Sequence, residues 1–245
     1  HLVGAEGGVP VEIDRSRAWI GHDALEELRF AWSADSRWIA WSRPSSTGSQ
    51  AVFLYDTTAS KLTQATSGYF SDLQPAFDSE GKYLYYLSNR AFTPTYGDFD
   101  NGWTYANSTQ IVAVPLRADV PSPLAARNDV EPPKDAAAEP ASKDATKPEA
   151  KAPSAAVKSG QAGVVEAGKA KEEKVDPPKP VEIALDGFET RAIILPFKSG
   201  NYTDLWAVKG KVAVRRLPRA GSGDEKRPFV YFDLAEREEK TVLED

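Results

Sequence analysis

A hairpin motif that recurs at a fixed interval is the feature of this sequence that most restricts its fold. Residues 33–41 read SADSRWIAW, and residues 78–86 read DSEGKYLYY, 45 positions further along. In the first copy Asp35 can accept a hydrogen bond from the backbone two residues on, which predicts a tight turn between two antiparallel strands. A repeat of this period is typical of β-propeller blades, each of which contains four antiparallel strands.

Further apolar segments supply the remaining strands of each repeat. In the first repeat we expect strands at 28–32, 38–42, 51–56 and 61–66. Segments of the second repeat are expected at 75–86 and 110–116, and segments of a third at 205–214, 229–234 and 240–243. The chain is therefore predicted to be all-β, with about three blades and, within residues 2–13, a remnant of a fourth. Because an unclosed propeller leaves sheet faces bare, further blades are expected in the parent protein.

The middle of the chain has a different composition. Residues 123–180 contain nine of the 18 prolines, ten basic and ten acidic residues, and no aromatic residue. A segment so poor in large apolar side chains does not offset the entropy of ordering its backbone. We predict a disordered Ala/Pro/Lys/Glu-rich insertion at 123–180, with a docking tail as the alternative. This insertion separates two predicted folded regions. Residues 1–122 are predicted to form a remnant blade and two further blades, and residues 181–245 are predicted to form one more blade.

Composition also excludes several kinds of site. The absence of cysteine removes disulfides, thiolate zinc sites and a cysteine nucleophile. The formal charge is −6 with no strongly basic stretch, which argues against nucleic acid, and no apolar run is long enough to span a membrane. The two histidines, His1 and His22, are too few for a typical zinc site, and neither is expected to be a catalytic base. No cofactor is predicted, and a chain that starts at His1 is expected to be processed or truncated.

Longer motifs narrow the choice of propeller family. Residues 33–41 resemble the SPDGK-x-IAF hairpin of TolB and tricorn propellers, with Ser36 where glycine is usual. We therefore expect a turn without positive φ at Ser36. Several stretches resemble blades of bacterial tricorn-like serine peptidases: 68–72, 75–78, 83–96, 107–111, 185–191 and 195–202. The resemblance covers essentially all of the chain outside the insertion, and such relatives tend to carry a charged insertion at the same place.

The resemblance implies a multidomain serine peptidase in which propellers precede a PDZ-like module and a catalytic core. None of the core's motifs is present, so no catalytic residue is assigned, and this segment alone is not expected to be an enzyme. The expected partners are peptide substrates, the downstream PDZ-like and catalytic domains, and further copies in a hexamer. The expected location is cytoplasmic, with the periplasm as the alternative.

Five residues are candidates for peptide contact. Tyr96, Phe99 and Trp103 lie in an aromatic-rich loop, and loops on a rigid scaffold often carry function. Arg43 and Arg90 have the charge to attract a peptide carboxylate, or else pair with neighbouring acids. The acidic residues that flank Phe99 lack the ligand spacing of a calcium loop, so a metal site there is the weaker interpretation.

Three functions remain open on this evidence. The first is a non-catalytic propeller segment that guides or filters peptides for a catalytic core outside the chain. The second is a TolB-like protein-binding propeller without a protease, and the third is the gating propeller of a prolyl-oligopeptidase-type enzyme. Under each of them Trp32, Trp38 and Trp41 are predicted to pack in the core and between blades.

Overall fold

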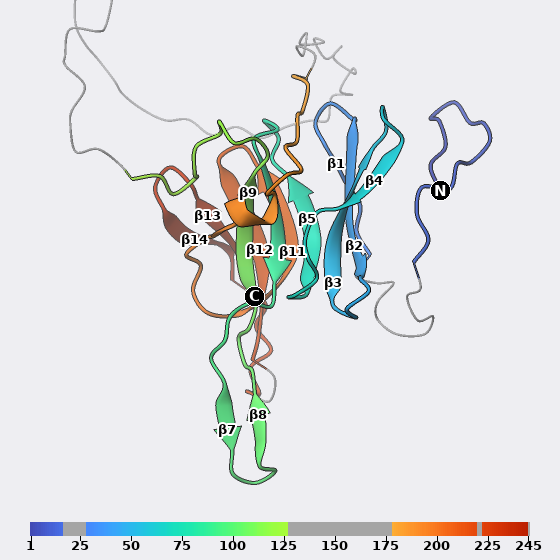
Figure 1. The fold of residues 1–245 in the computed structure, drawn as a ribbon. Helices are drawn as coiled ribbons and strands as arrows, with labels where there is room; N and C mark the ends of the chain where they lie inside the picture. The colour runs from blue at the N-terminus through green and yellow to red at the C-terminus, as the bar shows by residue number, and fades with distance from the viewer. Residues whose placement is uncertain (17–27, 127–177, 220–221, 245) are drawn as a thin grey trace, which may run out of the picture. The chain divides into compact units, whose positions relative to one another are not determined.

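The computed structural model describes residues 1–16, 28–126, 178–219 and 222–244. Within these ranges the fold is all-β, as predicted, with three sheets of four antiparallel strands and one separate two-stranded hairpin (Figure 1). The predicted disorder of the insertion falls almost wholly on residues 127–177, which lie outside the described residues. In the part of the chain that the structure covers, no helix is long and apolar enough to cross a membrane.

Blade 1 is the four-stranded sheet predicted from the first repeat. Its strands are β1 (Ala31–Trp32), β2 (Trp38–Pro44), β3 (Gln50–Asp56) and β4 (Lys61–Gln64), paired in that order. The turn between β1 and β2 uses Asp35 as expected, because its Oδ1 accepts a hydrogen bond from the Arg37 amide at 3.2 Å. The prediction for Ser36 was wrong, since its φ is +59°. Ser36 takes the left-handed conformation that Gly81 takes, at φ +67°, in the corresponding turn of the next blade.

Blade 2 is interrupted twice by other segments. Its strands are β5 (Asp72–Phe77), β6 (Tyr83–Ser88), β9 (Gln110–Pro115) and β10 (Ile193–Ile194), in the order β5-β6-β9-β10 across the sheet. The hairpin of β7 (Thr95–Gly97) and β8 (Gly102–Thr104) separates β6 from β9, and the insertion separates β9 from β10. The predicted boundary at 181 therefore needs correction, because residues after the insertion first complete blade 2. A 3-10 turn at Glu189–Arg191 leads into β10.

Blade 3 is made entirely from residues that follow the insertion. Its strands are β11 (Asn201–Val208), β12 (Lys211–Leu217), β13 (Phe229–Asp233) and β14 (Glu238–Leu243). The described N-terminal residues, 1–16, form one antiparallel bridge, between Leu2 and Val11, and no named strand. Leu2 and Ile13 pack against the outer face of blade 1, so this face is covered by the preceding segment.

The core lies between the blades, and β6 supplies both sides of it. Leu84 and Tyr86 pack in the cluster that joins blades 1 and 2. Tyr83, Tyr85 and Leu87 pack in the cluster that joins blades 2 and 3. All six residues of β6 are buried because successive side chains of a strand point to opposite faces and both faces meet another sheet.

The chain is fixed to blade 1 at the point where it returns from the insertion. Trp38 Nε1 donates a hydrogen bond to the Val181 carbonyl at 2.9 Å, and the Val181 amide donates to Asp35 Oδ2 at 2.6 Å. The Val181 side chain is 2% exposed and belongs to the cluster between blades 1 and 2. Buried backbone amides and carbonyls need hydrogen-bond partners, and both of these groups of Val181 find their partners at the β1–β2 turn.

An aspartate ends the third strand of two blades and organises the turn that follows. Asp56 Oδ1 accepts hydrogen bonds from the amides of Thr58 and Ala59, and its carboxylate pairs with Arg37. Asp233 repeats the arrangement with the next turn and pairs with Lys211. Each aspartate thus joins the start of the second strand, the end of the third and the turn to the fourth.

Asp233→Asn is expected to reduce stability at neutral pH and to cost progressively less in acid. The Lys211 ammonium group, followed by the Glu236 and Ala235 amides, lowers the pKa of Asp233 from 3.8 to about 2. A carboxyl group whose pKa is lower in the folded than in the unfolded state stabilises the fold at any pH above its unfolded-state pKa. This contribution disappears as the pH falls through its folded-state pKa. Urea unfolding from neutral pH down toward pH 2 measures the difference. The exposed Asp98→Asn variant is the control, and a pH-independent deficit for Asp233→Asn would contradict the assignment.

Candidate functional site

Arg43, on β2, is held in an internal ion pair. Its Nε and Nη2 atoms lie 2.5 and 3.0 Å from the two carboxylate oxygens of Asp14, and its guanidinium lies 3.6 Å from the centre of the Phe53 ring. The Arg43 and Asp14 side chains are 19% and 12% exposed. A peptide carboxylate would therefore have to compete with Asp14 for this guanidinium.

Arg90, two residues after the end of β6, is even more enclosed. Its Nε donates to Ser88 Oγ at 2.7 Å, and its Nη2 lies 3.2 Å from Asp72 Oδ1. The guanidinium also lies 4.9 Å from the centre of the Phe70 ring. Burial raises the pKa of Asp72, whose side chain is fully buried, while Ser88 and Arg90 oppose that rise. Like Arg43, Arg90 is bound to a neighbouring acid, which was the alternative interpretation of both residues.

The three aromatic candidates do come together, on the β7–β8 hairpin. Tyr96 and Trp103 are register partners, and their ring centres lie 5.1 Å apart in an edge-to-face arrangement. Phe99 lies at the tip and is completely exposed. A second ring pair, Phe92 with Tyr105, follows at 5.5 Å toward the blade. The predicted site thus separates into two enclosed arginines and one group of aromatic side chains, which we call the aromatic hairpin (residues 92–105).

A second candidate site, the inner groove, lies where the first strands of the three blades meet. It has a volume of about 230 Å³. Its walls come from β1, β5 and β11, namely residues 29–32, 75–77 and 205–207. Trp32 and Trp206 are 48% and 58% exposed there. The prediction that Trp32 is a core residue was wrong, whereas Trp38 and Trp41 are buried as predicted.

Two β-bulges shape this groove. The pairing of β5 with β6 shifts between Leu73 and Ala76, and the pairing of β11 with β12 shifts between Thr203 and Trp206. Each bulge contains a residue with positive φ, Gln74 at +49° and Asp204 at +53°. Bulges redirect side chains next to a site, and here they lie beside Pro75 and Trp206.

The side chains of the bulge residues join the groove walls. Gln74 is buried, its Nε2 donates to Thr203 Oγ1 at 3.0 Å, and its Oε1 accepts from the Leu205 amide at 3.3 Å. Asp204 pairs with Arg215 at 3.1 Å and also with Arg29, which precedes β1. Hydrogen bonds and ion pairs of these two polar residues therefore join the strands that form the apolar walls of the groove.

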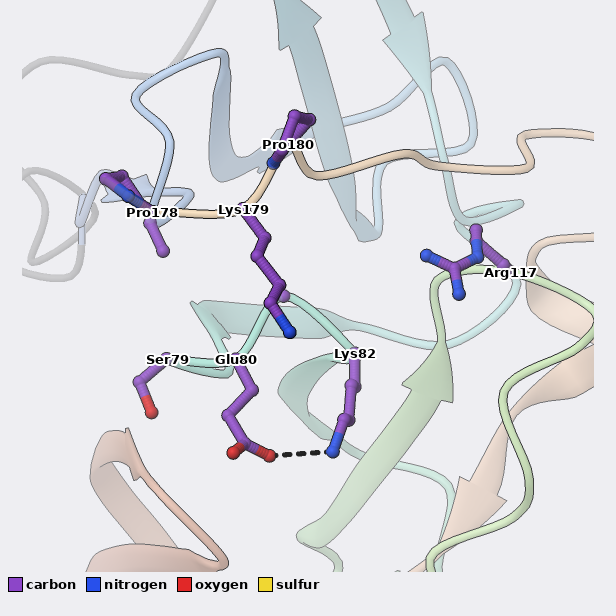
Figure 2. A pocket seen from close by; sticks show the side chains of 9 residues that line it. Ser79, Glu80, Lys82, Arg117, Pro178, Lys179 and Pro180 are labelled. Carbon is purple, nitrogen blue, oxygen red and sulfur yellow. Dashed lines mark hydrogen bonds and ion pairs between the residues drawn. The ribbon is translucent and has the colours of Figure 1, made fainter. Parts of the chain in front are cut away.

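A third hollow, of about 500 Å³, lies at the turns of blades 1 and 2 (Figure 2). Lys82, Arg117 and Lys179 line it together with Glu80. Lys82 pairs with Glu80 at 2.8 Å, and Glu80 is also 3.2 Å from Lys209. Because its acid is already paired with two lysines, this hollow is best described as a surface ion-pair network.

His1, the one histidine among the described residues, lines none of these surfaces. His1 Nε2 lies 3.9 Å from Glu12, and both side chains are largely exposed, whereas His22 lies outside the described residues. Among the described residues, no group of three or more histidine, aspartate or glutamate side chains is placed to hold a metal ion.

Comparison with known proteins decides the family. A family model described as the tricorn protease second beta propeller domain matches residues 1–245. The chain belongs to this tricorn propeller family. Among curated relatives, the tricorn propeller segment is 37% identical over 142 residues to the tricorn protease of Thermoplasma volcanium. It is 32% identical over 123 residues to tricorn protease homolog 1 of Streptomyces coelicolor.

Each of these alignments covers only part of both proteins. They span 54% and 50% of the tricorn propeller segment, and 13% and 11% of the two relatives. A crystal structure of the tricorn protease matches 99% of the segment with a TM-score of 0.65 and 21% identity, over 20% of its own chain. A putative TolB from Agrobacterium tumefaciens matches 97% with a TM-score of 0.50 and 11% identity, over 53% of its chain. At these identities the two structures show the propeller fold alone.

Sequence reasoning missed the inner groove for a physical reason. The strand β1 is only two residues long, which is too short for an alternation of apolar and polar residues to show whether the Trp32 side chain is buried or exposed. A usable signal exists at Gln74-Pro75, because proline within a strand indicates a bulge or an edge. Phe92 was also overlooked, although it belongs to the same aromatic-rich loop as the three predicted residues.

Proposed function

We propose that this tricorn propeller segment guides or filters peptide substrates for a catalytic core outside the chain. The observation that carries the proposal is the inner groove, where the first strands of three blades present Trp32 and Trp206 to solvent. Aromatic side chains bury a large area against an extended peptide at low entropic cost. A groove of this size has room for a peptide segment, and a folded domain does not fit into it.

The family supports the peptidase context of this proposal. The matched relatives are named tricorn proteases, and a propeller without catalytic residues of its own would act there by controlling access. Downstream PDZ-like and catalytic domains, and a hexameric assembly, are proposed as partners on the same basis. A cytoplasmic location is proposed with them, and the periplasm is the alternative.

A comparison of peptide hydrolysis tests the function directly. The full-length gene product is expected to hydrolyse a mixed peptide pool and to react with a serine-directed probe, whereas the 245-residue chain does neither. Trp206→Ala in the full-length protein is expected to slow hydrolysis of long peptides several-fold and to leave dipeptide esters unaffected, because only long substrates reach the groove. Hydrolysis by the short chain alone would overturn the non-catalytic role.

A TolB-like binding propeller without a protease is the second candidate, because the propeller fold is shared with a putative TolB over 97% of the chain and the fold alone does not separate the two functions. In that case the full-length gene product would bind a protein partner and would not react with the serine probe. The same assay therefore separates the two functions.

A further inference from the structure

The aromatic hairpin projects from blade 2 as a separate two-stranded sheet (Figure 1). Five of its side chains are aromatic, and each is between 46% and 102% exposed: Phe92, Tyr96, Phe99, Trp103 and Tyr105. A two-stranded hairpin alone is only marginally stable in water, and these aromatic side chains are not buried in any core. An exposed aromatic surface of this kind indicates a site of interaction with another molecule.

The outer edges of the hairpin offer backbone groups to a partner. The strands β7 and β8 pair with each other, and the described residues place no third strand beside either one. An unpaired edge of this kind accepts an extended peptide as an additional strand. The two ring pairs of the hairpin, Tyr96 with Trp103 and Phe92 with Tyr105, would then contact side chains of that peptide.

The charge of the hairpin selects the kind of peptide. Between Arg90 and Arg117 the sequence contains Asp98 and Asp100 and no lysine, arginine or histidine. Asp100 Oδ1 accepts a hydrogen bond from the Gly102 amide, whereas Asp98 is exposed at the tip. Aromatic faces and carboxylates both attract a guanidinium or ammonium group, and both disfavour phosphates and carboxylates.

We propose that the aromatic hairpin captures extended, arginine- or lysine-containing peptides. The peptide adds to an outer edge of the hairpin, its cations lie over the exposed ring faces, and the tip carboxylates strengthen the attraction. This inference rests on the proposed peptide-handling function, and it names the class of peptide and a capture site separate from the inner groove.

Binding of two matched peptides to the full-length gene product tests the proposal. Both are short, fluorescein-labelled and built of glycine and serine, one with arginine and the other with glutamate at alternate positions. Fluorescence anisotropy is expected to show binding of the arginine peptide only, with an affinity that falls as the salt concentration rises. Trp103→Ala is expected to weaken that binding about fivefold, as loss of one cation–π contact would.

Tyr69→Ala is the matched control, because Tyr69 is 80% exposed and lies outside both the aromatic hairpin and the inner groove. It removes an exposed aromatic ring from another surface and is expected to leave arginine-peptide binding unchanged, whereas Trp206→Ala reports whether the peptide binds in the inner groove instead. Asp98→Asn is expected to weaken binding about twofold and to reduce its salt dependence. None of these side chains is buried, so the variants are expected to fold.

Three outcomes would overturn the proposal. They are equal binding of both peptides, loss of binding in Trp206→Ala but not in Trp103→Ala, and a concentration-dependent dimer that Trp103→Ala dissociates without any peptide binding. The last would assign the hairpin to contact between copies. Peptide hydrolysis without hairpin-dependent binding would leave the proposed function intact, whereas hairpin-dependent binding without hydrolysis would overturn the peptidase function alone.

Discussion

Replacing Arg90 with alanine is expected to lower the free energy of unfolding by about 3 kcal/mol, because removing one partner of a buried ion pair leaves the other charge uncompensated. The partner is Asp72, whose side chain is fully buried, and Arg90 itself is 11% exposed. Ser88 Oγ donates a hydrogen bond to Asp72 Oδ1 at 2.5 Å, but a hydroxyl does not neutralise the carboxylate. Equilibrium unfolding in urea measures the loss.

The pH dependence of this loss identifies its cause. Burial already raises the pKa of Asp72, and removal of Arg90 raises it further. A carboxyl group whose pKa is higher in the folded than in the unfolded state favours folding at low pH. This stabilisation is lost as the pH rises through the folded-state pKa of the group. The deficit of Arg90→Ala is therefore expected to shrink in acid and to be largest near neutrality.

The exposed pair of Arg117 and Asp119 provides the control for Arg90. These side chains are 40% and 69% exposed and lie 2.8 Å apart. Arg117→Ala is expected to cost much less than Arg90→Ala, because exposed ion pairs contribute little to stability. Equal losses for Arg90→Ala and Arg117→Ala would show that the internal network does not stabilise the fold.

Gly81→Ala is expected to destabilise the protein by about 2–3 kcal/mol, because a left-handed residue with a side chain is strained and the new methyl group meets a packed neighbour. The φ of Gly81 is +67°, and a Cβ atom there would lie 2.7 Å from Val181 Cγ2. Val181 is buried and its backbone is fixed by hydrogen bonds to Asp35 and Trp38, so it has little freedom to move. Thermal and urea unfolding measure the effect.

Gly210→Ala separates the two causes. Gly210 has nearly the same φ, +71°, and no atom lies within 4 Å of the Cβ position. Only the backbone strain remains, and a loss of about 1 kcal/mol is expected. If both variants lose the same free energy, the contact with Val181 contributes nothing. Partial recovery of Gly81→Ala by a second change, Val181→Ala, would confirm the contact through its coupling energy.

The sequence predicted the blades where local signals suffice. The strands β2, β3, β12, β13 and β14 follow from alternating or continuous apolar runs between turn residues, and Asp35 forms the expected turn bond. The conformation of Ser36 was not predictable from its identity, because the hairpin geometry requires positive φ at this position whichever residue occupies it. Tertiary context overrides the residue's own preference there.

The sites were less predictable because they depend on contacts between distant segments. The partners of Arg43 and Arg90 are Asp14 and Asp72, and nothing in the local pattern pairs them. The exposure of Trp206 likewise depends on which blades surround the groove. Only the aromatic hairpin was visible beforehand, because its residues are close in sequence and no second sheet covers them.

The separation of β10 from β9 has a consequence for how the protein is made. Blade 1 closes from the contiguous residues 31–64, so it can form early during synthesis on the ribosome. Blade 2 has three strands by residue 115, but the free edge of β9 receives no partner until Ile193 and Ile194 emerge. Translation therefore leaves this edge open for the whole time in which the insertion is synthesised. An unpaired strand edge in a partly folded chain is prone to aggregation, and this edge is closed only when Ile193 and Ile194 pair with Ala113 and Val112.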